Sequence, residues 1–307
     1  MAAIFEAPTI EQQASVLRNN SALRWPSALA PIQPAGSKAP LFCFGLGAGP
    51  IFRSLAEHLG ADQPVIAVDP NLLDPSAVPA PYRMEEVAAG LAQQIRELQP
   101  EGPYYLGGIC GGGLMAYATA SHLIANGQEI GLIALFEPHT SYYANYVEHS
   151  DGHGLRWLGK RVKFHIDNMR PLDGKDTVAY IRDHFRERSR VFGNVVNGFV
   201  HKTFSALQPA ADNGRKRTIQ QILGPAWRDY RPMPVSAPVA LFQATRRDPG
   251  GEWERQYWMD LASELDVYDV PGYSNWIVRF FIEPSVEVLA SKLRRYLPGA
   301  GTQEAQG

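Results

Sequence analysis

A cysteine flanked by glycines is the residue of this chain best placed for nucleophilic chemistry. Gly108, Cys110 and Gly112 form a Gly-x-Cys-x-Gly pattern, which follows the apolar run YYLGG and opens a helix-like segment. In such a strand-turn-helix arrangement the central side chain occupies a strained corner at the end of the sheet, and only small neighbours leave room for it. The central residue of this pattern is usually a serine that acts as the nucleophile. Because cysteine stands at that position here, the pattern predicts a thiol nucleophile. The alternative is a glycine-rich connection around a buried, inert cysteine.

The predicted corner supplies the electrostatics that a thiol nucleophile needs. A helix that begins after Cys110 points its N-terminus at the side chain, and this favours the thiolate. The backbone N–H of Gly111 faces any oxyanion that forms there. A second donor is expected from the FGLGAG loop, at the N–H of Gly47, although a simple glycine-rich turn is the alternative. The other cysteine, Cys43, lies inside the apolar run LFCF and is expected to be a core residue.

Apolar runs too short for helices alternate with amphipathic segments through most of the chain. Strands are predicted at residues 41–44, 65–68, 104–108, 132–137 and 239–244, and helices at residues 52–59, 84–98 and 285–297. Such alternation predicts the α/β class, with a mostly parallel sheet covered by helices on both faces. The alternation stops over about residues 139–234, and this span is predicted to be a helical lid inserted over the strand ends.

The first 40 residues do not follow this alternation. Residues 1–20 are predicted to hold one short amphipathic helix, with a capping-box pattern at Thr9 and Gln12. Residues 21–40 are predicted to be a linker whose prolines prevent regular structure. These prolines are Pro26, Pro31, Pro34 and Pro40. One short helix on such a linker cannot bury a core of its own, so the main domain is expected to begin at residue 41.

The composition fits one larger α/β domain, because the chain has 307 residues, of which 45% are hydrophobic and 20% charged. A formal net charge of −2 leaves no basic field for nucleic acid, and there is no polybasic run for a membrane surface. No apolar stretch approaches the roughly 20 residues of a spanning helix. The N-terminus lacks a signal-peptide pattern and the two cysteines lie far apart in the chain, so a cytoplasmic location is expected.

Three segments resemble the thioesterase domains that end nonribosomal peptide and polyketide synthases. They are residues 102–137 with the cysteine turn, residues 41–68 with the glycine loop, and residues 270–297 near the C-terminus. The resemblance implies an α/β-hydrolase fold for residues 41–298, with residues 299–307 as a flexible tail. It also implies that the segment FEAPTIEQQASVLR is the last helix of a carrier-protein domain.

The resemblance further implies an acyl-transfer enzyme that releases a finished chain. The acyl or peptidyl substrate would arrive as a thioester on the 4′-phosphopantetheine of an upstream carrier domain, and the domain itself would bind no cofactor and no metal. Cys110 would accept the chain, and release would follow by hydrolysis, by cyclisation or by transfer to an amine. The upstream carrier domain and the acyl thioester are therefore the expected partners.

The catalytic positions implied by the resemblance depart from the family's Ser-Asp-His pattern. The acid position carries Glu137 in place of aspartate, although this residue alone could equally be a solvated loop acid. Asp248, after a later strand, is the alternative acid. The histidine position, two residues past Val-Pro-Gly, carries Ser274. Of the eight histidines, His139 is the one placed to approach the site, and a structural role is its alternative.

Loss of the histidine lowers the catalytic rate of a cysteine enzyme less than that of a serine enzyme. An unperturbed thiol, with a pKa of about 8.5, is already a few per cent thiolate at pH 7. The acyl-cysteine is itself a thioester, so its exchange with a carrier thioester is nearly neutral in energy. Release to water still needs a base, whereas release to an amine or a thiol needs one much less. The competing hypothesis is a thioesterase-like domain that binds the carrier or the acyl chain without turnover.

Overall fold

The structure is a computed structural model that divides into two compact units, residues 1–150 with 217–307 and residues 151–216. The described residues are 25–47, 49–73, 83–138, 229–246, 251–273 and 280–299, with the isolated positions 166, 174, 223, 226 and 227. The predicted carrier helix, and most of the predicted lid and C-terminal tail, lie outside these residues. The candidate site residues His139, Asp248 and Ser274 lie outside them as well.

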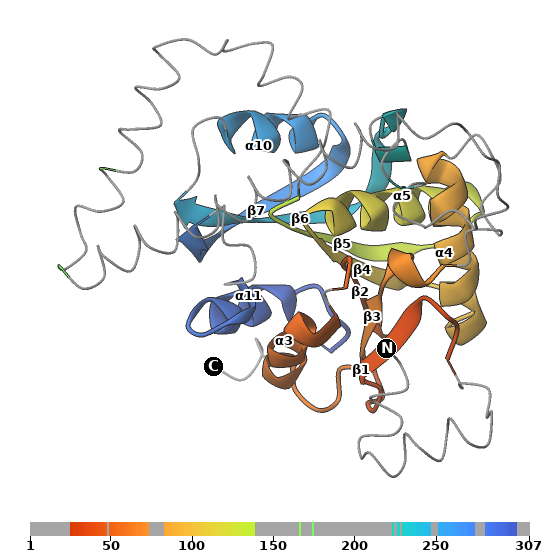
Figure 1. Ribbon diagram of the computed structural model, residues 1–307, viewed down its shortest axis with the longest axis horizontal. Coiled ribbons are helices and arrows are strands. Elements are labelled where there is room, and N and C mark those ends of the chain that lie inside the picture. The colour runs from red at the N-terminus through yellow and green to blue at the C-terminus, as the bar shows by residue number, and fades with distance from the viewer. Residues whose placement is uncertain are drawn as a thin grey trace, which may run out of the picture. The chain divides into compact units, whose positions relative to one another are not determined.

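The described strands form one sheet in the order β1-β3-β2-β4-β5-β6-β7 (Figure 1). Their bounds are β1 (Leu29–Gln33), β2 (Leu41–Phe44), β3 (Val65–Val68), β4 (Tyr104–Ile109), β5 (Ile130–Phe136), β6 (Val235–Arg246) and β7 (Ala262–Tyr273). β1 runs antiparallel to β3, and every other neighbouring pair of these strands is parallel. The predicted mostly parallel sheet is confirmed, because its buried middle strands are the continuous apolar runs of the sequence.

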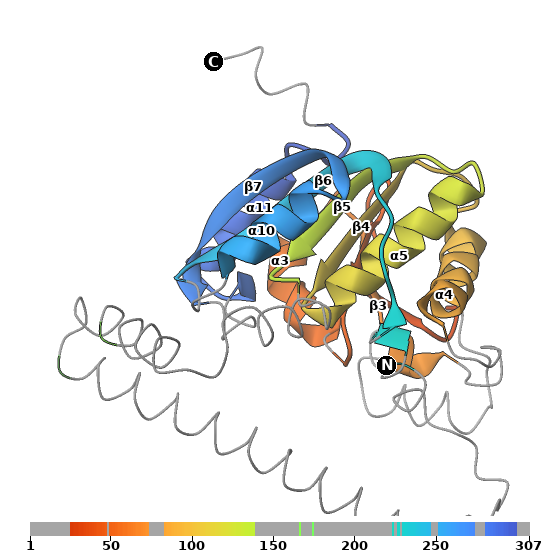
Figure 2. The same ribbon diagram turned by 90° about the horizontal axis from the view of Figure 1, so that it is seen from above.

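Helices cover both faces of this sheet, as predicted. They are α3 (Phe52–Leu59), α4 (Met84–Leu98), α5 (Gly111–Ala125), α10 (Gly251–Met259) and α11 (Ser285–Leu293), with the short 3-10 turns η1 (Gly49–Ile51) and η2 (Pro70–Leu72). α4, α5 and α10 contribute to one core cluster, and α3 and α11 contribute to a second. Figure 2 shows these two groups on opposite sides of the sheet. Among the described residues, no helix is long and apolar enough to cross a membrane.

The prediction that prolines keep residues 21–40 irregular is wrong for β1. Pro31 lies inside this strand, opposite Ile66 of β3. A proline cannot donate to a sheet ladder, but β1 lies at the edge of the sheet that the described strands form, so the missing donor is tolerated there. The pairing register shifts between Pro31 and Gln33. The sheet therefore begins before residue 41.

Glycines around Cys110 allow three backbone segments to meet. A Cβ on Gly112 would lie 2.3 Å from the carbonyl oxygen of Phe44, at the end of β2. A Cβ on Gly108 would lie 2.3 Å from the carbonyl oxygen of Gly112. No side chain fits at such distances, so α5 can start against the ends of β2 and β4 only with glycine at both positions. This close approach determines where Cys110 lies.

Gly112→Ala is expected to destabilise the domain by about 1–3 kcal/mol, as overpacked sites do, because the added methyl group meets main-chain atoms. Gly90→Ala is the matched control. Gly90 lies in α4, where a Cβ would meet nothing closer than Leu73 Cδ2 at 3.9 Å, and alanine favours a helix over glycine. Urea unfolding followed by circular dichroism measures both variants. Equal unfolding midpoints for Gly112→Ala and the unmodified protein would contradict the close approach.

Candidate active site

Cys110 lies at the corner between β4 and α5, in a backbone conformation that is rare for a residue with a side chain. Its φ is 53° and its ψ is −126°. The Cys110 N–H donates to the carbonyl oxygen of Phe136 at 3.1 Å, and the Gly113 N–H donates to the carbonyl oxygen of Cys110 at 3.0 Å. Strained conformations cost of order 1–3 kcal/mol and persist only where the surrounding structure imposes them. The predicted strand-turn-helix corner is confirmed.

The two cysteines differ in environment. Cys43, inside β2, is fully buried, and desolvation raises the pKa of its thiol well above the usual range. Cys110 is half-buried and lies at the N-terminus of α5, whose first turn carries no acidic residue. The helix dipole at this end favours thiolate over thiol. Cys43 is thus the core residue that the sequence predicted, and Cys110 remains the candidate nucleophile.

Glu137 is buried at the end of β5, the strand that pairs with β4. Glu137 and Cys110 therefore both directly follow neighbouring parallel strands. The exposed fraction of Glu137 is 2%, which excludes the alternative of a solvated loop acid. One of its carboxylate oxygens accepts a hydrogen bond from the Ala244 N–H in β6, and its own N–H donates to the carbonyl oxygen of Phe242 at 2.9 Å. The carboxyl group is therefore held in place, as the acid that orients a catalytic base must be.

The glycine loop after β2 lies beside the cysteine corner, but the N–H of Gly47 already has an acceptor. It donates to Oδ2 of Asp69 at 3.1 Å. Asp69 is 3% exposed, and its Oδ1 accepts from the Asn71 N–H at 3.0 Å. Gly47 can therefore donate to an oxyanion only if its N–H leaves Asp69. The N–H of Gly111, in contrast, belongs to the first turn of α5 and has no acceptor within its own helix.

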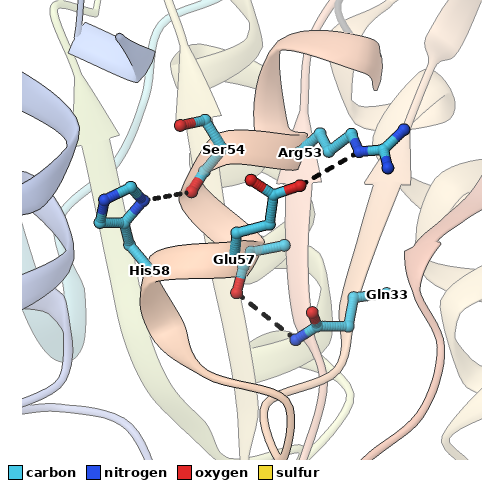
Figure 3. A network of polar contacts seen from close by, with 6 residues as sticks. Gln33, Arg53, Ser54, Glu57 and His58 are labelled. Carbon is cyan, nitrogen blue, oxygen red and sulfur yellow. Dashed lines mark hydrogen bonds and ion pairs between the residues drawn. The ribbon is translucent and has the colours of Figure 1, made fainter. Parts of the chain in front are cut away.

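The two histidines in the described residues lie on helices, as predicted, and not at the ends of the strands. His58 is near the C-terminal end of α3, where its Nδ1 contacts the carbonyl oxygen of Ser54 at 2.8 Å (Figure 3) and its Nε2 contacts Glu283 at 2.5 Å. His122 lies about 16 Å along α5 from its N-terminus, at 1.5 Å per residue. In the same part of the chain, His, Cys, Asp and Glu side chains do not gather in threes that could hold a metal ion.

Trp227 and Asp69 contact the site, and the sequence analysis assigned neither of them a role. A Cβ on Gly111 would lie 3.0 Å from Cζ2 of the Trp227 indole, so this ring covers the residue after the nucleophile. The ring is half-buried and packs against the core cluster that contains α4 and α5. Asp69 has a sequence signal, since it is an acid that directly follows a predicted strand. Trp227 has none, because its contact joins residues far apart in the chain.

Iodoacetamide is expected to alkylate Cys110 at least about tenfold faster than Cys43 at pH 7, since one thiol is accessible at a helix N-terminus and the other is desolvated. Peptide mass spectrometry of samples quenched at successive times measures both rates. In concentrated urea the two rates should become similar, and this serves as the control. Equal or reversed rates in the folded protein would contradict the placement of Cys110.

Comparison with known proteins identifies the family. The thioesterase-domain family profile matches residues 39–274. Malpinin synthetase of Mortierella alpina is 35% identical over 153 residues, which are 48% of this chain and 2% of the relative. A dimodular nonribosomal peptide synthase of Bacillus subtilis is 29% identical over 240 residues, which are 74% of this chain and 10% of the relative. This chain therefore spans a small part of the length of these relatives.

A solved structure agrees with the profile. The thioesterase domain of NocB, from the nocardicin cluster, matches with a TM-score of 0.52 at 20% identity, over 88% of this chain and 99% of that domain. At such identity the likeness concerns the fold, which is the α/β-hydrolase-like arrangement that the family resemblance implied. Because the profile covers most of the chain and the fold agrees with it, this chain belongs to the thioesterase-domain family.

Proposed function

We propose that this chain is the chain-releasing thioesterase domain of a larger peptide or polyketide synthase. In this proposal Cys110 accepts an acyl or peptidyl chain from the 4′-phosphopantetheine thioester of an upstream carrier domain. The observation that carries the proposal is the corner of Cys110, a half-buried thiol on a strained backbone at the N-terminus of α5. The relatives support the setting, because they are synthetases and synthases of which this chain spans 2% to 10%.

The acylation step exchanges one thioester for another. The Cys110 thiolate attacks the carbonyl carbon of the carrier thioester, and the carbonyl oxygen becomes an oxyanion to which the Gly111 N–H donates. When this intermediate collapses, the new carbon–sulfur bond to Cys110 remains and the bond to the pantetheine sulfur breaks. The pantetheine sulfur leaves as a thiolate and takes up a proton from solvent. Because both ends are thioesters, the transfer is nearly balanced in free energy and reversible.

The remaining roles follow the family pattern. Glu137 is proposed as the acid of the site because its buried carboxyl group is fixed by Ala244 beside the strand of the nucleophile, and Asp248 is the alternative. Ser274 is proposed to occupy the place of the family's histidine. Gly47 is proposed as the second oxyanion donor, and it would act by moving its N–H from Asp69 to the oxyanion.

Release from Cys110 is proposed to use a nucleophile stronger than water. A serine hydroxyl at position 274 cannot take a proton from water at neutral pH, and a positioned general base typically contributes about 10² to 10⁴-fold. An amine or a thiol attacks a thioester without that help. Transfer to an amine, from a separate molecule or from the chain itself in a cyclisation, is therefore the release reaction that these residues favour over hydrolysis.

A second candidate function is a domain that binds the acyl chain or the carrier without turnover. The observation that favours it is the hydrogen bond from the Gly47 N–H to Asp69, which withdraws one of the two expected oxyanion donors. Loss of one oxyanion donor typically lowers kcat by about 10² to 10³-fold, because the tetrahedral intermediate is then less stabilised.

Incubation with the hexanoyl thioester of N-acetylcysteamine is expected to add one hexanoyl group to the protein, because Cys110 exchanges thioesters without a base. Intact-protein mass spectrometry measures the adduct. Cys43→Ala should keep it and Cys110→Ala should lose it. A folded protein that shows no adduct, or an adduct that persists in Cys110→Ala, would count against the proposal.

The decay of the adduct separates the two candidate functions. Decay that is slow in buffer and fast after addition of a primary amine supports acyl transfer with release to an amine. An adduct that is stable under both conditions supports the binding domain without turnover.

A further inference from the structure

A tryptophan occupies the place that a side chain at position 111 would fill. A Cβ on Gly111 would lie 3.0 Å from Cζ2 of Trp227 and 3.5 Å from its Cε2 and Cη2. The six-membered ring of the indole is therefore the part nearest to the backbone of Gly111. Since consecutive Cα atoms lie about 3.8 Å apart, the ring lies against the residue that directly follows the nucleophile candidate Cys110.

The segment that carries Trp227 is anchored to the core beside α5. Three of its side chains are buried in the core cluster that contains α5, namely Leu223, Ala226 and Tyr230. The hydroxyl of Tyr117, on α5, donates to the carbonyl oxygen of Met233 at 2.9 Å. Contacts on both sides of Trp227 along the chain therefore hold its ring as a fixed apolar surface.

The glycine at position 111 makes room for this ring. Carbon atoms that are not bonded pack at about 3.5–4.0 Å, so a methyl group 3.0 Å from Cζ2 would push the indole away from the helix. The Trp227 indole thus packs in the space that the missing side chain of Gly111 leaves open. The backbone of Gly111 supplies an N–H at the nucleophile, and Trp227 supplies an apolar ring beside it.

We infer that Trp227 is a wall of the acyl site and makes the domain selective for apolar acyl chains of several carbons. The inference rests on the proposed acylation of Cys110. An indole is a large and rigid apolar surface, and an acyl chain that lies along it leaves water. A two-carbon acyl group ends before it covers the ring, whereas a six-carbon chain extends along it. The ring therefore discriminates by chain length, and it does not take part in the bond changes at sulfur.

Acylation of Cys110 by the acetyl and hexanoyl thioesters of N-acetylcysteamine tests this role in the full chain. For Trp227→Ala, the second-order rate constant with the hexanoyl thioester is expected to fall about tenfold, and that with the acetyl thioester less than about threefold. Trp227→Phe keeps an aromatic ring and should recover most of the hexanoyl-to-acetyl ratio. Met233→Ala truncates a side chain of the same segment that is 72% exposed, and it should leave the ratio unchanged.

The possible results are distinct. A purely structural role of Trp227 would slow both thioesters equally and leave their ratio at the value of the unmodified protein, and this result would overturn the inference. If neither thioester acylates the unmodified protein, the proposed function fails instead. If acylation occurs and the ratio falls in Trp227→Ala alone, both proposals are supported.

A second measurement does not depend on the alanine variant. A nitroxide label attached through a disulfide to Cys110 quenches tryptophan fluorescence at short range. Relative to its own unlabelled form, the labelled protein should therefore lose a larger fraction of its emission than labelled Trp227→Phe does. Equal quenching in the two proteins would place the indole away from Cys110. That result would overturn the inference even if Trp227→Ala did not fold.

Discussion

The close approach of main-chain atoms at the ends of β2 and β4 is the constraint on which the rest of the site depends. The carbonyl oxygen of Phe44 lies where a side chain of Gly112 would be, and the carbonyl oxygen of Gly112 lies where a side chain of Gly108 would be. With these segments in contact, the chain turns from β4 into α5 through the positive φ of Cys110. The thiol is consequently placed at a helix N-terminus, beside the glycine loop and the end of β5.

Much of the sheet could be predicted from the sequence, since the strands from β2 to β6 are buried on both faces and appear as continuous apolar runs. The two edge strands could not. β1 contains Pro31, which an edge tolerates, and β7 carries charged residues such as Glu264 and Asp266, which suit a strand at the edge of the sheet formed by the described residues. Neither segment is predicted as a strand from its sequence, because continuous apolar runs are typical of strands inside a sheet.

The candidate site divides in the same way. Cys110 became a candidate from local spacing, and Glu137 from the position at which the resembling family keeps its acid. The structure places both residues at the carboxyl ends of neighbouring parallel strands. The bond between Gly47 and Asp69 and the contact between Trp227 and Gly111 could not be predicted, since each joins segments that only the folded sheet brings together. Both contacts bear on function. The first withdraws an expected oxyanion donor, and the second places an apolar ring against the residue that follows Cys110.

A cysteine in this family setting suits the exchange of one thioester for another. The helix dipole favours the thiolate without a histidine, so the proposed acylation of Cys110 needs no general base. Hydrolysis would need such a base, and we propose that Ser274 occupies the position of the family's histidine. The proposed apolar wall at Trp227 would further make water a poor competitor. Chain transfer to an amine or a thiol is the reaction that makes use of all three features.

Transfer of a chain from a loaded carrier domain to Cys110 is the most direct measurement of the central claim. A carrier domain that bears hexanoyl-phosphopantetheine is mixed with an equimolar amount of the full chain, and the intact masses of both proteins are followed with time. Near-neutral exchange predicts that the hexanoyl group lost from the carrier appears on the thioesterase domain, and that both proteins stay partly loaded at the plateau. Cys110→Ala should show no transfer. A carrier that stays fully loaded, or that loses its chain to water equally fast with Cys110→Ala, would contradict acyl transfer through this thiol.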